Sequence, residues 1–223
     1  MPHHLTELTV GTYDKIAGQY ANDFLNNDHD EKIARGFSTG LARGARILDA
    51  GCGCGGASKV FLDNGFDVVG IDLSTEMLKI AKTHASKAHF EIGDVRATRF
   101  SAGEFDAIYA SRIFCHLQNR DRTKTLREFR RVLKPNGKLM IVNTVSRKSY
   151  GEIEREPYDE NLKIFYNYFT LDDLKKSITG AGFSIKDVRT EDHIDEDTNQ
   201  PVTLAVVLST NLSFRQPVHS IKF

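Results

Sequence analysis

The segment Arg46-Ile-Leu-Asp-Ala-Gly-Cys-Gly-Cys-Gly-Gly56 decides the fold, because a short apolar run passes there directly into a glycine-rich turn. Glycines let the backbone turn sharply at a strand end and let a ligand approach the main chain closely. The residues from Ala57 onward then begin a helix, whose free N–H groups favour a negatively charged or polar ligand group. Because Gly51, Gly53 and Gly56 also satisfy the dinucleotide pattern G-x-G-x-x-G, the turn alone does not choose the ligand.

Four further apolar runs follow the turn, and segments with helical spacing separate them. Ser74 can cap the helix after the second strand, and another helix is predicted from about Asp121. Strands that alternate with helices at this pace predict βαβ units and a parallel sheet with right-handed crossovers. The four strands are expected at residues 67–71, 88–92, 105–110 and 138–143.

The rhythm changes after residue 143. Thr170 can cap a helix over residues 170–179, and two apolar runs at 183–188 and 203–208 look like strands. A turn is enough to join these two strands, so they can pair antiparallel, and the acidic stretch 191–199 between them is predicted as a loop. We therefore predict an α/β fold with a doubly wound, seven-stranded, mostly parallel sheet and a reversed C-terminal strand.

Helical segments precede the first strand. Apolar residues recur at helical spacing from Tyr13 to Phe24, and a second helix is expected over residues 30–42. The 223 residues are enough for one α/β domain with a full core, so we predict a single domain over 1–223. Its expected parts are an N-terminal helical cap (1–44), a cofactor-binding core (45–143), a substrate lid (144–169) and a C-terminal helix with strands (170–210).

Two further acids stand where the next two strands end. Asp72 follows the second strand, where a carboxylate can accept hydrogen bonds from both ribose hydroxyls. Asp94 follows the third, where it can accept from the exocyclic amine of adenine while Val95 packs on the ring. The carboxyl ends of parallel strands meet at one edge of the sheet, where open α/β sheets bind ligands. The acids therefore predict a nucleoside-containing cofactor.

Taken in order, these segments resemble the class I, Rossmann-like S-adenosylmethionine-dependent methyltransferases of the small-molecule type. The similar motifs are ILDAGCGCGG (47–56), VVGIDLS (68–74), GDVRATRF (93–100), FDAIYASRIFCHL (105–117) and LREFRRVLKPNGKLMIV (126–142). Cys54 departs from the Thr or Ser that is usual in the first motif. The resemblance runs from Tyr13 to about Leu208. It implies S-adenosyl-L-methionine as cofactor and methyl transfer to an O, N or C atom of a small-molecule acceptor.

The resemblance also implies roles for single residues. The turn with Asp49 would face the methionine part of the cofactor, and Ser111 would border the donor methyl group. The leading helix with Tyr13 and Tyr20 would cover the cofactor. The residues expected to bind the cofactor are Tyr13, Tyr20, Asp49, Gly51, Cys52, Gly53, Gly55, Asp72, Leu73, Met77, Asp94, Val95 and Ser111.

Methyl transfer from a sulfonium is an in-line displacement, in which the protein aligns donor and acceptor and excludes water. His116, after the fourth strand, is the candidate catalytic base, with the alternative that it only orients its loop. Arg112 either binds an acidic substrate or faces solvent. The aromatic-rich residues 150–169 predict a lid over an aromatic-lined pocket, with a structural packing role as the alternative. The substrate-binding candidates are Arg112, Tyr150, Tyr166 and Tyr168.

The composition narrows the partners. Lys plus Arg and Asp plus Glu number 30 each, so there is no general attraction to phosphate polymers, and we expect no nucleic-acid partner. The three cysteines argue against a disulfide framework and, without a Cys or His cluster to complete a site, against a metal. With no signal-peptide pattern and no apolar run near the roughly 20 residues of a membrane helix, we expect a cytoplasmic protein away from membranes. The sequence leaves a homodimer open.

Two other functions fit part of the pattern. An NAD(P)-dependent oxidoreductase would use the same glycines, but Asp49 places a charge before the first glycine, where dinucleotide folds usually stay apolar. A non-catalytic protein that binds S-adenosylmethionine is the second alternative. The residues Ser111-Arg-Ile-Phe114 after the fourth strand lack an Asn-Pro-Pro-Tyr type signature, which argues against a methylase of DNA bases or glutamine.

Overall fold

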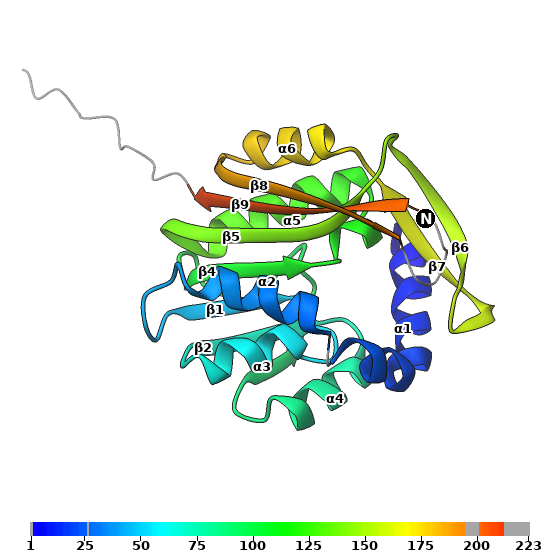
Figure 1. Cartoon of the computed structure of the whole chain (residues 1–223), viewed down its shortest axis with the longest axis horizontal. Helices are drawn as coiled ribbons and strands as arrows, with labels where there is room; N and C mark the ends of the chain where they lie inside the picture. The colour runs from blue at the N-terminus through cyan, green and yellow to red at the C-terminus, as the bar shows by residue number, and fades with distance from the viewer. Residues whose placement is uncertain (1, 26, 195–200, 212–223) are drawn as a thin grey trace, which may run out of the picture.

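A computed structural model describes residues 2–25, 27–194 and 201–211 of the chain and shows a central sheet with helices on both faces (Figure 1). The seven strands lie in the order β3-β2-β1-β4-β5-β9-β8. Strand β9 runs antiparallel to both of its neighbours, which confirms the predicted mostly parallel sheet with a reversed C-terminal strand. The strands are β1 (Arg46–Ala50), β2 (Asp67–Asp72), β3 (His89–Ile92), β4 (Phe105–Ser111), β5 (Leu133–Val145), β8 (Phe183–Ile194) and β9 (Pro201–Asn211).

The helices form two layers. Residues of α2 and α3 pack on one face of the sheet with Ile47 of β1, and residues of α5 and α6 pack on the other face with Leu48. Consecutive strand residues point to opposite faces, so a parallel strand covered on both sides is an unbroken apolar run. The helices are α1 (Pro2–Phe24), α2 (Asp28–Ser38), α3 (Gly56–Asp63), α4 (Thr75–His84), α5 (Asn119–Val132) and α6 (Leu171–Gly180), with a short 3₁₀ helix η1 (Phe114–His116).

Polar caps set several helix starts. The Ser74 hydroxyl accepts a hydrogen bond from the Met77 amide at 3.1 Å, and Thr170 accepts from Asp173 in the same way, as predicted.

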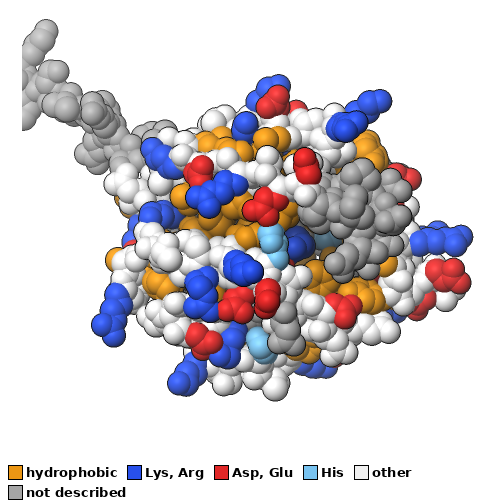
Figure 2. Space-filling view, viewed as in Figure 1, with side chains coloured by type: hydrophobic (Ala, Val, Ile, Leu, Met, Phe, Trp, Pro, Cys, Tyr) orange, Lys and Arg blue, Asp and Glu red, His pale blue; other side chains and the backbone are white. Residues whose placement is uncertain are grey.

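Charged side chains of both signs are mixed over the face shown in Figure 2.

Several element boundaries differ from the predictions. Helix α1 starts well before Tyr13, because Thr9 and Thr12 are buried against a neighbouring strand although they form no apolar stripe. Helix α2 ends at Ser38, earlier than the predicted 42. The loop predicted over 191–199 is wrong for residues 191–194, because β8 continues to Ile194 through pairing with β9, and cross-strand pairing outweighs local propensity. Residues 195–199 lie outside the described residues.

The segment after β5 forms an antiparallel hairpin of β6 (Tyr150–Glu156) and β7 (Asp159–Tyr168). The hairpin lies beside α1 (Figure 1), and the Thr12 hydroxyl donates to the Lys163 carbonyl at 2.6 Å. The Thr9 hydroxyl accepts from the Phe165 amide at 3.4 Å. This contact brings residues of the predicted lid segment against the N-terminal helix.

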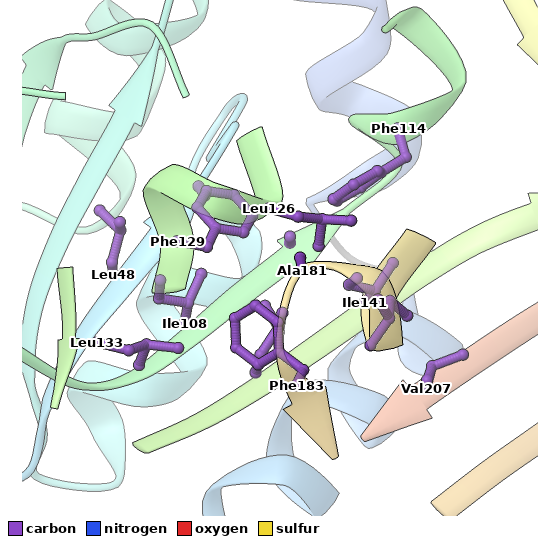
Figure 3. Close-up of a cluster of buried hydrophobic side chains, with 14 of the residues drawn as sticks. Leu48, Ile108, Phe114, Leu126, Phe129, Leu133, Ile141, Ala181, Phe183 and Val207 are labelled. Atoms are coloured by element: carbon purple, nitrogen blue, oxygen red, sulfur yellow. The ribbon is translucent and has the colours of Figure 1, made fainter. Parts of the chain in front are cut away.

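The core can be tested with two isoleucines of equal size. Ile108 on β4 is fully buried in the cluster of Figure 3, whereas Ile92 at the end of β3 is 59% exposed. We expect Ile108→Ala to lower the free energy of unfolding by about 2–5 kcal/mol, because it leaves a cavity in a close-packed core. Ile92→Ala should stay within about 0.5 kcal/mol. Urea denaturation measures both, and equal losses would contradict the assignment of the core.

Candidate functional site

A cavity opens at the carboxyl ends of β1, β2, β3 and β4, and α1 forms one of its walls. Its empty space, open mouth included, is about 840 Å³. The cavity lies at the strand ends where open α/β sheets bind ligands. Its lining residues are Thr6, Thr9, Val10, Tyr13, Tyr20, Gly51, Gly53, Asp72, Leu73, Met77, Gly93, Asp94, Val95, Arg96, Ser111, Arg112, Ile113, His116 and Leu117.

The glycine turn brings bare backbone to the cavity floor. Gly51 and Gly53 have φ of 70° and 50°, a region that residues with a Cβ rarely adopt. A Cβ on Gly51 would come within 2.0 Å of the Ile113 side chain, so the β1 turn and the loop after β4 pack together only without one. A Cβ on Gly53 would meet nothing within 4 Å and would project into open space. The turn therefore leaves a cradle beside its main chain.

Asp72 is fixed at the end of β2 by two backbone amides. Its carboxylate accepts from the Gly53 amide and from the Ser74 amide, each at 2.9 Å. Burial raises the pKa of Asp72, and these hydrogen bonds limit the rise by favouring the ionised form. The carboxylate is thereby held rigidly in the cavity wall, between the glycine turn and the start of α4.

Asp94, at the end of β3, pairs with a residue that the sequence interpretation missed. Arg96 donates to both carboxylate oxygens of Asp94, with distances between 2.8 and 3.0 Å. Burial raises the pKa of Asp94, but the bonds from Arg96 outweigh it, and the pKa falls below its usual value. Arg96 also reaches Thr6 of α1 at 3.1 Å and Asp121 of α5 at 3.5 Å. It thus ties the cap helix to the strand end.

Asp49 lies in a different environment from the other two acids. It is 2% exposed, and the Ser58 hydroxyl donates to it at 2.6 Å. Burial raises its pKa to about 7. Asp49 does not line the first cavity but a second, adjoining cavity that shares Tyr20, Gly51, Gly53, Ser111 and Arg112 with the first. The three acids therefore surround two connected spaces, with Asp72 and Asp94 facing the first.

His116 stands between two partners. Its Nδ1 lies 2.9 Å from the Phe165 carbonyl and its Nε2 lies 3.0 Å from the Tyr13 hydroxyl. A carbonyl only accepts, so Nδ1 carries a proton and the Nε2 of the neutral ring accepts from Tyr13. Burial by itself lowers the pKa of His116, but Cys115, the Phe165 carbonyl and Glu156 outweigh it, and the net pKa is raised.

Arg112 is held by an acid of α2. Its guanidinium donates to both carboxylate oxygens of Asp30, at 2.6 and 2.9 Å, and it lies over the ring of Phe24. Arg112 lines both cavities, so it does not simply face solvent. A substrate that bound Arg112 would contact a guanidinium that already donates to Asp30. The sequence offered no signal for this pair, because the two residues lie 82 positions apart.

The other predicted residues divide by position. Tyr13, Tyr20, Leu73, Met77, Val95 and Ser111 line the first cavity, and Cys52 lines the second. Gly55 lines neither cavity. Its φ is 87° and a Cβ there would come within 3.0 Å of Ala81, so the position needs glycine for the backbone conformation and the packing. Tyr150, Tyr166 and Tyr168 also line neither cavity, although the Tyr166 ring lies 5.1 Å from that of His116. Sequence reasoning missed the contributions of Thr6, Thr9, Val10, Arg96, Ile113 and Leu117.

The cysteines Cys52, Cys54 and Cys115 are free thiols. Within the described part of the chain, no group of three or more His, Cys, Asp or Glu side chains could hold a metal ion. No helix among the described residues has the length and apolar character needed to cross a membrane.

Known proteins share the motifs and the fold. Residues 47–137 match a family model described as a methyltransferase domain. The chain is 34% identical over 154 residues to a demethylmenaquinone methyltransferase of Renibacterium salmoninarum, covering 67% of this chain and 63% of that protein. It is 37% identical over 108 residues to phosphoethanolamine N-methyltransferase 3 of Arabidopsis thaliana, covering 46% and 22%. The chain thus spans less than two thirds of the length of either relative.

A solved structure agrees with the fold over most of the chain. The 1,6-didemethyltoxoflavin-N1-methyltransferase of Burkholderia thailandensis, with 1,6-didemethyltoxoflavin and S-adenosylhomocysteine bound, superposes with a TM-score of 0.74 at 19% identity. The superposition covers 96% of this chain and 91% of that structure. At this identity the likeness concerns the fold.

The raised pKa of Asp49 predicts a pH-dependent stability. Between pH 4 and 7 the native state binds more protons at Asp49 than the unfolded chain does, because the pKa rises from 3.8 to about 7 on folding. Stability from this group therefore falls as pH rises through this window. The free energy of unfolding of Asp49→Asn minus that of the parent chain should therefore be a few kcal/mol larger at pH 8 than at pH 4. Each pKa unit is worth about 1.4 kcal/mol.

Urea denaturation of both proteins from pH 4 to 8 measures this difference. Other titrating groups are common to both proteins and cancel. Ser58→Ala is the companion variant, because loss of the hydrogen bond to the ionised carboxylate should raise the pKa of Asp49 further. A stability difference between Asp49→Asn and the parent that does not change with pH would show that Asp49 is solvated.

Proposed function

We propose that the chain is a class I, Rossmann-like methyltransferase and that it transfers a methyl group from S-adenosylmethionine to an O, N or C atom of a small-molecule acceptor. The observation that carries the proposal is the placement of Asp72 and Asp94 in one cavity beside the bare backbone of Gly51 and Gly53. A nucleoside needs such acceptors for its hydroxyl and amine hydrogens.

The residues present fit this cofactor. Asp72 would bind the ribose, and Asp94 with Val95 would hold the adenine. The open space at Gly53, which a Cβ would fill, leaves room for the cofactor chain to pass close to the backbone. Ser111 and Asp49 border the shared wall of the two cavities, where the methionine part would lie. When bound, the cofactor supplies an electrophilic methyl group on sulfonium.

The chain's own chemistry centres on His116 and Tyr13. With Nδ1 held by the Phe165 carbonyl, Nε2 is the site that gains a proton, and it lies 3.0 Å from the hydroxyl of Tyr13, which lines the cavity with His116. A proton leaving an acceptor can therefore pass to Tyr13 while Tyr13 passes its own to His116. Burial raises the pKa of Tyr13 well above its usual value, so the phenol stays protonated and serves as a relay. The remaining walls align the acceptor and exclude water.

A small-molecule acceptor away from nucleic acid agrees with the balanced charge of the chain and with the mixed charges in Figure 2. The free thiols agree with a cytoplasmic, reducing location. Homodimer formation stays a prediction, and gel filtration tests it.

Cofactor binding can be tested with glycines matched for backbone strain. Gly53 and Gly44 both have positive φ, 50° and 73°, and in both a Cβ would meet nothing within 4 Å. Alanine at either position should cost roughly 1 kcal/mol of stability. Only Gly53→Ala should weaken S-adenosylhomocysteine binding, by at least about tenfold, because its Cβ enters the cradle. Calorimetry measures both affinities.

The same titration separates the alternatives. Binding of NAD with no response to S-adenosylmethionine or S-adenosylhomocysteine would favour an oxidoreductase. S-adenosylhomocysteine binding without transfer of labelled methyl to any acceptor in a broad metabolite panel would favour a non-catalytic protein.

The proton relay predicts a specific pattern of losses. With an acceptor that must lose a proton, Tyr13→Phe and His116→Gln should each lower kcat by about 10²- to 10³-fold. The double variant should lose little more than either single one, because the residues act as a unit. Both residues line the cavity, so S-adenosylhomocysteine affinity is measured alongside, and it should change far less than kcat does.

The pH profile provides the second readout. In the parent enzyme kcat should rise as pH passes the raised pKa of His116, and this limb should disappear in His116→Gln. Unchanged kcat in both single variants would leave His116 with the role of orienting its loop.

A further inference from the structure

A row of aromatic rings leads from the proposed reaction centre to Tyr150 and Tyr168, at the end of the β6–β7 hairpin opposite its turn. The ring of His116 lies 5.4 Å from that of Tyr13 and 5.1 Å from that of Tyr166. Tyr166 lies 6.0 Å from Tyr168, and Tyr168 stacks on Tyr150 at 4.7 Å. Tyr166 and Tyr168 are half-buried and Tyr150 is 48% exposed, so the row connects the interior with solvent. We call Tyr150, Tyr166 and Tyr168 the tyrosine row.

Carboxylates accompany the tyrosine row. The Tyr168 hydroxyl donates to Glu154 at 2.7 Å. Glu156, on the same strand two residues further, is only 5% exposed, and its charge contributes to the raised pKa values of Tyr13, His116 and Tyr166. The register of the hairpin shifts between Arg155 and Glu156, so the carboxylate in direct contact with the row is that of Glu154.

Positive charge is neutralised around this region. Arg112 and Arg96, the two arginines that line the cavity, are each bound at both carboxylate oxygens of an aspartate, Asp30 and Asp94. On the hairpin, the Arg155 side chain is 77% exposed and points to the face opposite that of Glu154, its neighbour on the strand. An anionic acceptor would therefore find carboxylates and ring faces here, with the two guanidinium groups of the cavity wall already paired.

We propose that the tyrosine row, with Glu154, selects a cationic acceptor, namely an alkylamine that arrives as an ammonium ion. The proposal rests on the proposed methyltransferase function and narrows its acceptor to nitrogen. Aromatic faces attract ammonium groups through their quadrupole, and the attraction grows as water is removed. The row guides the cation from the exposed Tyr150 to the half-buried Tyr166 beside His116.

The reaction balances for this acceptor. The ammonium loses one proton through Tyr13 to Nε2 of His116, which frees the nitrogen lone pair. The lone pair forms the new N–C bond to the methyl group, and the electron pair of the breaking C–S bond returns to sulfur. The products are the N-methylated ammonium ion and S-adenosylhomocysteine, and His116 releases its proton to solvent. No oxidant or further reactant is needed.

Three probes of equal size and shape test the selection. They are choline, its uncharged carbon analogue 3,3-dimethylbutan-1-ol and the anion 3,3-dimethylbutanoate. Calorimetry on the full chain saturated with S-adenosylhomocysteine should give the tightest binding for choline, by at least about tenfold over the uncharged analogue, and the weakest for the anion. Equal or tighter binding of the uncharged analogue would overturn the proposal.

Matched variants locate the effect. Tyr166→Leu should lower choline affinity by about 3- to 30-fold with little change for the uncharged analogue, whereas Tyr166→Phe keeps the ring face and should bind normally. Glu154→Gln should weaken choline binding, and Glu160→Gln, an equal charge change at an 82% exposed position of the same hairpin, should not. Choline affinity that is unchanged in Tyr166→Leu would place the selecting groups elsewhere and contradict the proposal.

Binding of S-adenosylhomocysteine distinguishes a failure of the proposed methyltransferase function from a failure of the amine selection. It should be the same in the parent chain and in all four variants, since none of these residues lines the cavity. If the parent chain fails to bind S-adenosylhomocysteine, the proposed function fails. If it binds S-adenosylhomocysteine but shows no preference for the cation, only the amine selection fails.

Discussion

The close approach between the turn after β1 and the loop after β4 governs the site. Gly51 lies so near Ile113 that a single added carbon would overlap it. Because the two segments pack at this distance, the ends of β1 and β4 place the glycine turn, Ser111 and Arg112 around one wall that both cavities share. Core packing on both faces of the sheet holds the strands that present them.

Long-range polar contacts complete the enclosure that the sheet begins. Arg96 connects β3 to α1 and α5, Arg112 connects the loop after β4 to α2, and His116 connects that loop to α1 and the hairpin. The elements joined in this way come from distant parts of the chain, so the site forms only in the folded domain. Each contact also engages a charged or titratable side chain that lines the cavity, which couples the packing of α1 and α2 to the electrostatics of the cavity.

The sequence predicted the sheet well because β1, β2 and β4 are buried on both faces and therefore read as nearly unbroken apolar runs. It predicted the starts of α4 and α6 because Ser74 and Thr170 cap them through local hydrogen bonds. It could not predict the hairpin beside α1 or the pairing of Arg112 with Asp30, since both depend on residues far apart in the chain. The bond between Asp94 and Arg96 was within reach, because an Arg two residues after an acid at a strand end can close back on it.

Three aspartates at successive strand ends show how environment divides one residue type into different roles. Asp94 is paired with a guanidinium and ionises readily, Asp72 is held by two backbone amides, and Asp49 has one hydroxyl partner in a dry site. The first two can offer fixed negative charge to neutral hydroxyl and amine hydrogens. Asp49 holds a carboxyl that ionises near neutrality, so a positive group arriving beside it would stabilise the ionised form. Asp49 is thus the acid that would face the ammonium group of the proposed cofactor, if its methionine part lies at the wall that the two cavities share.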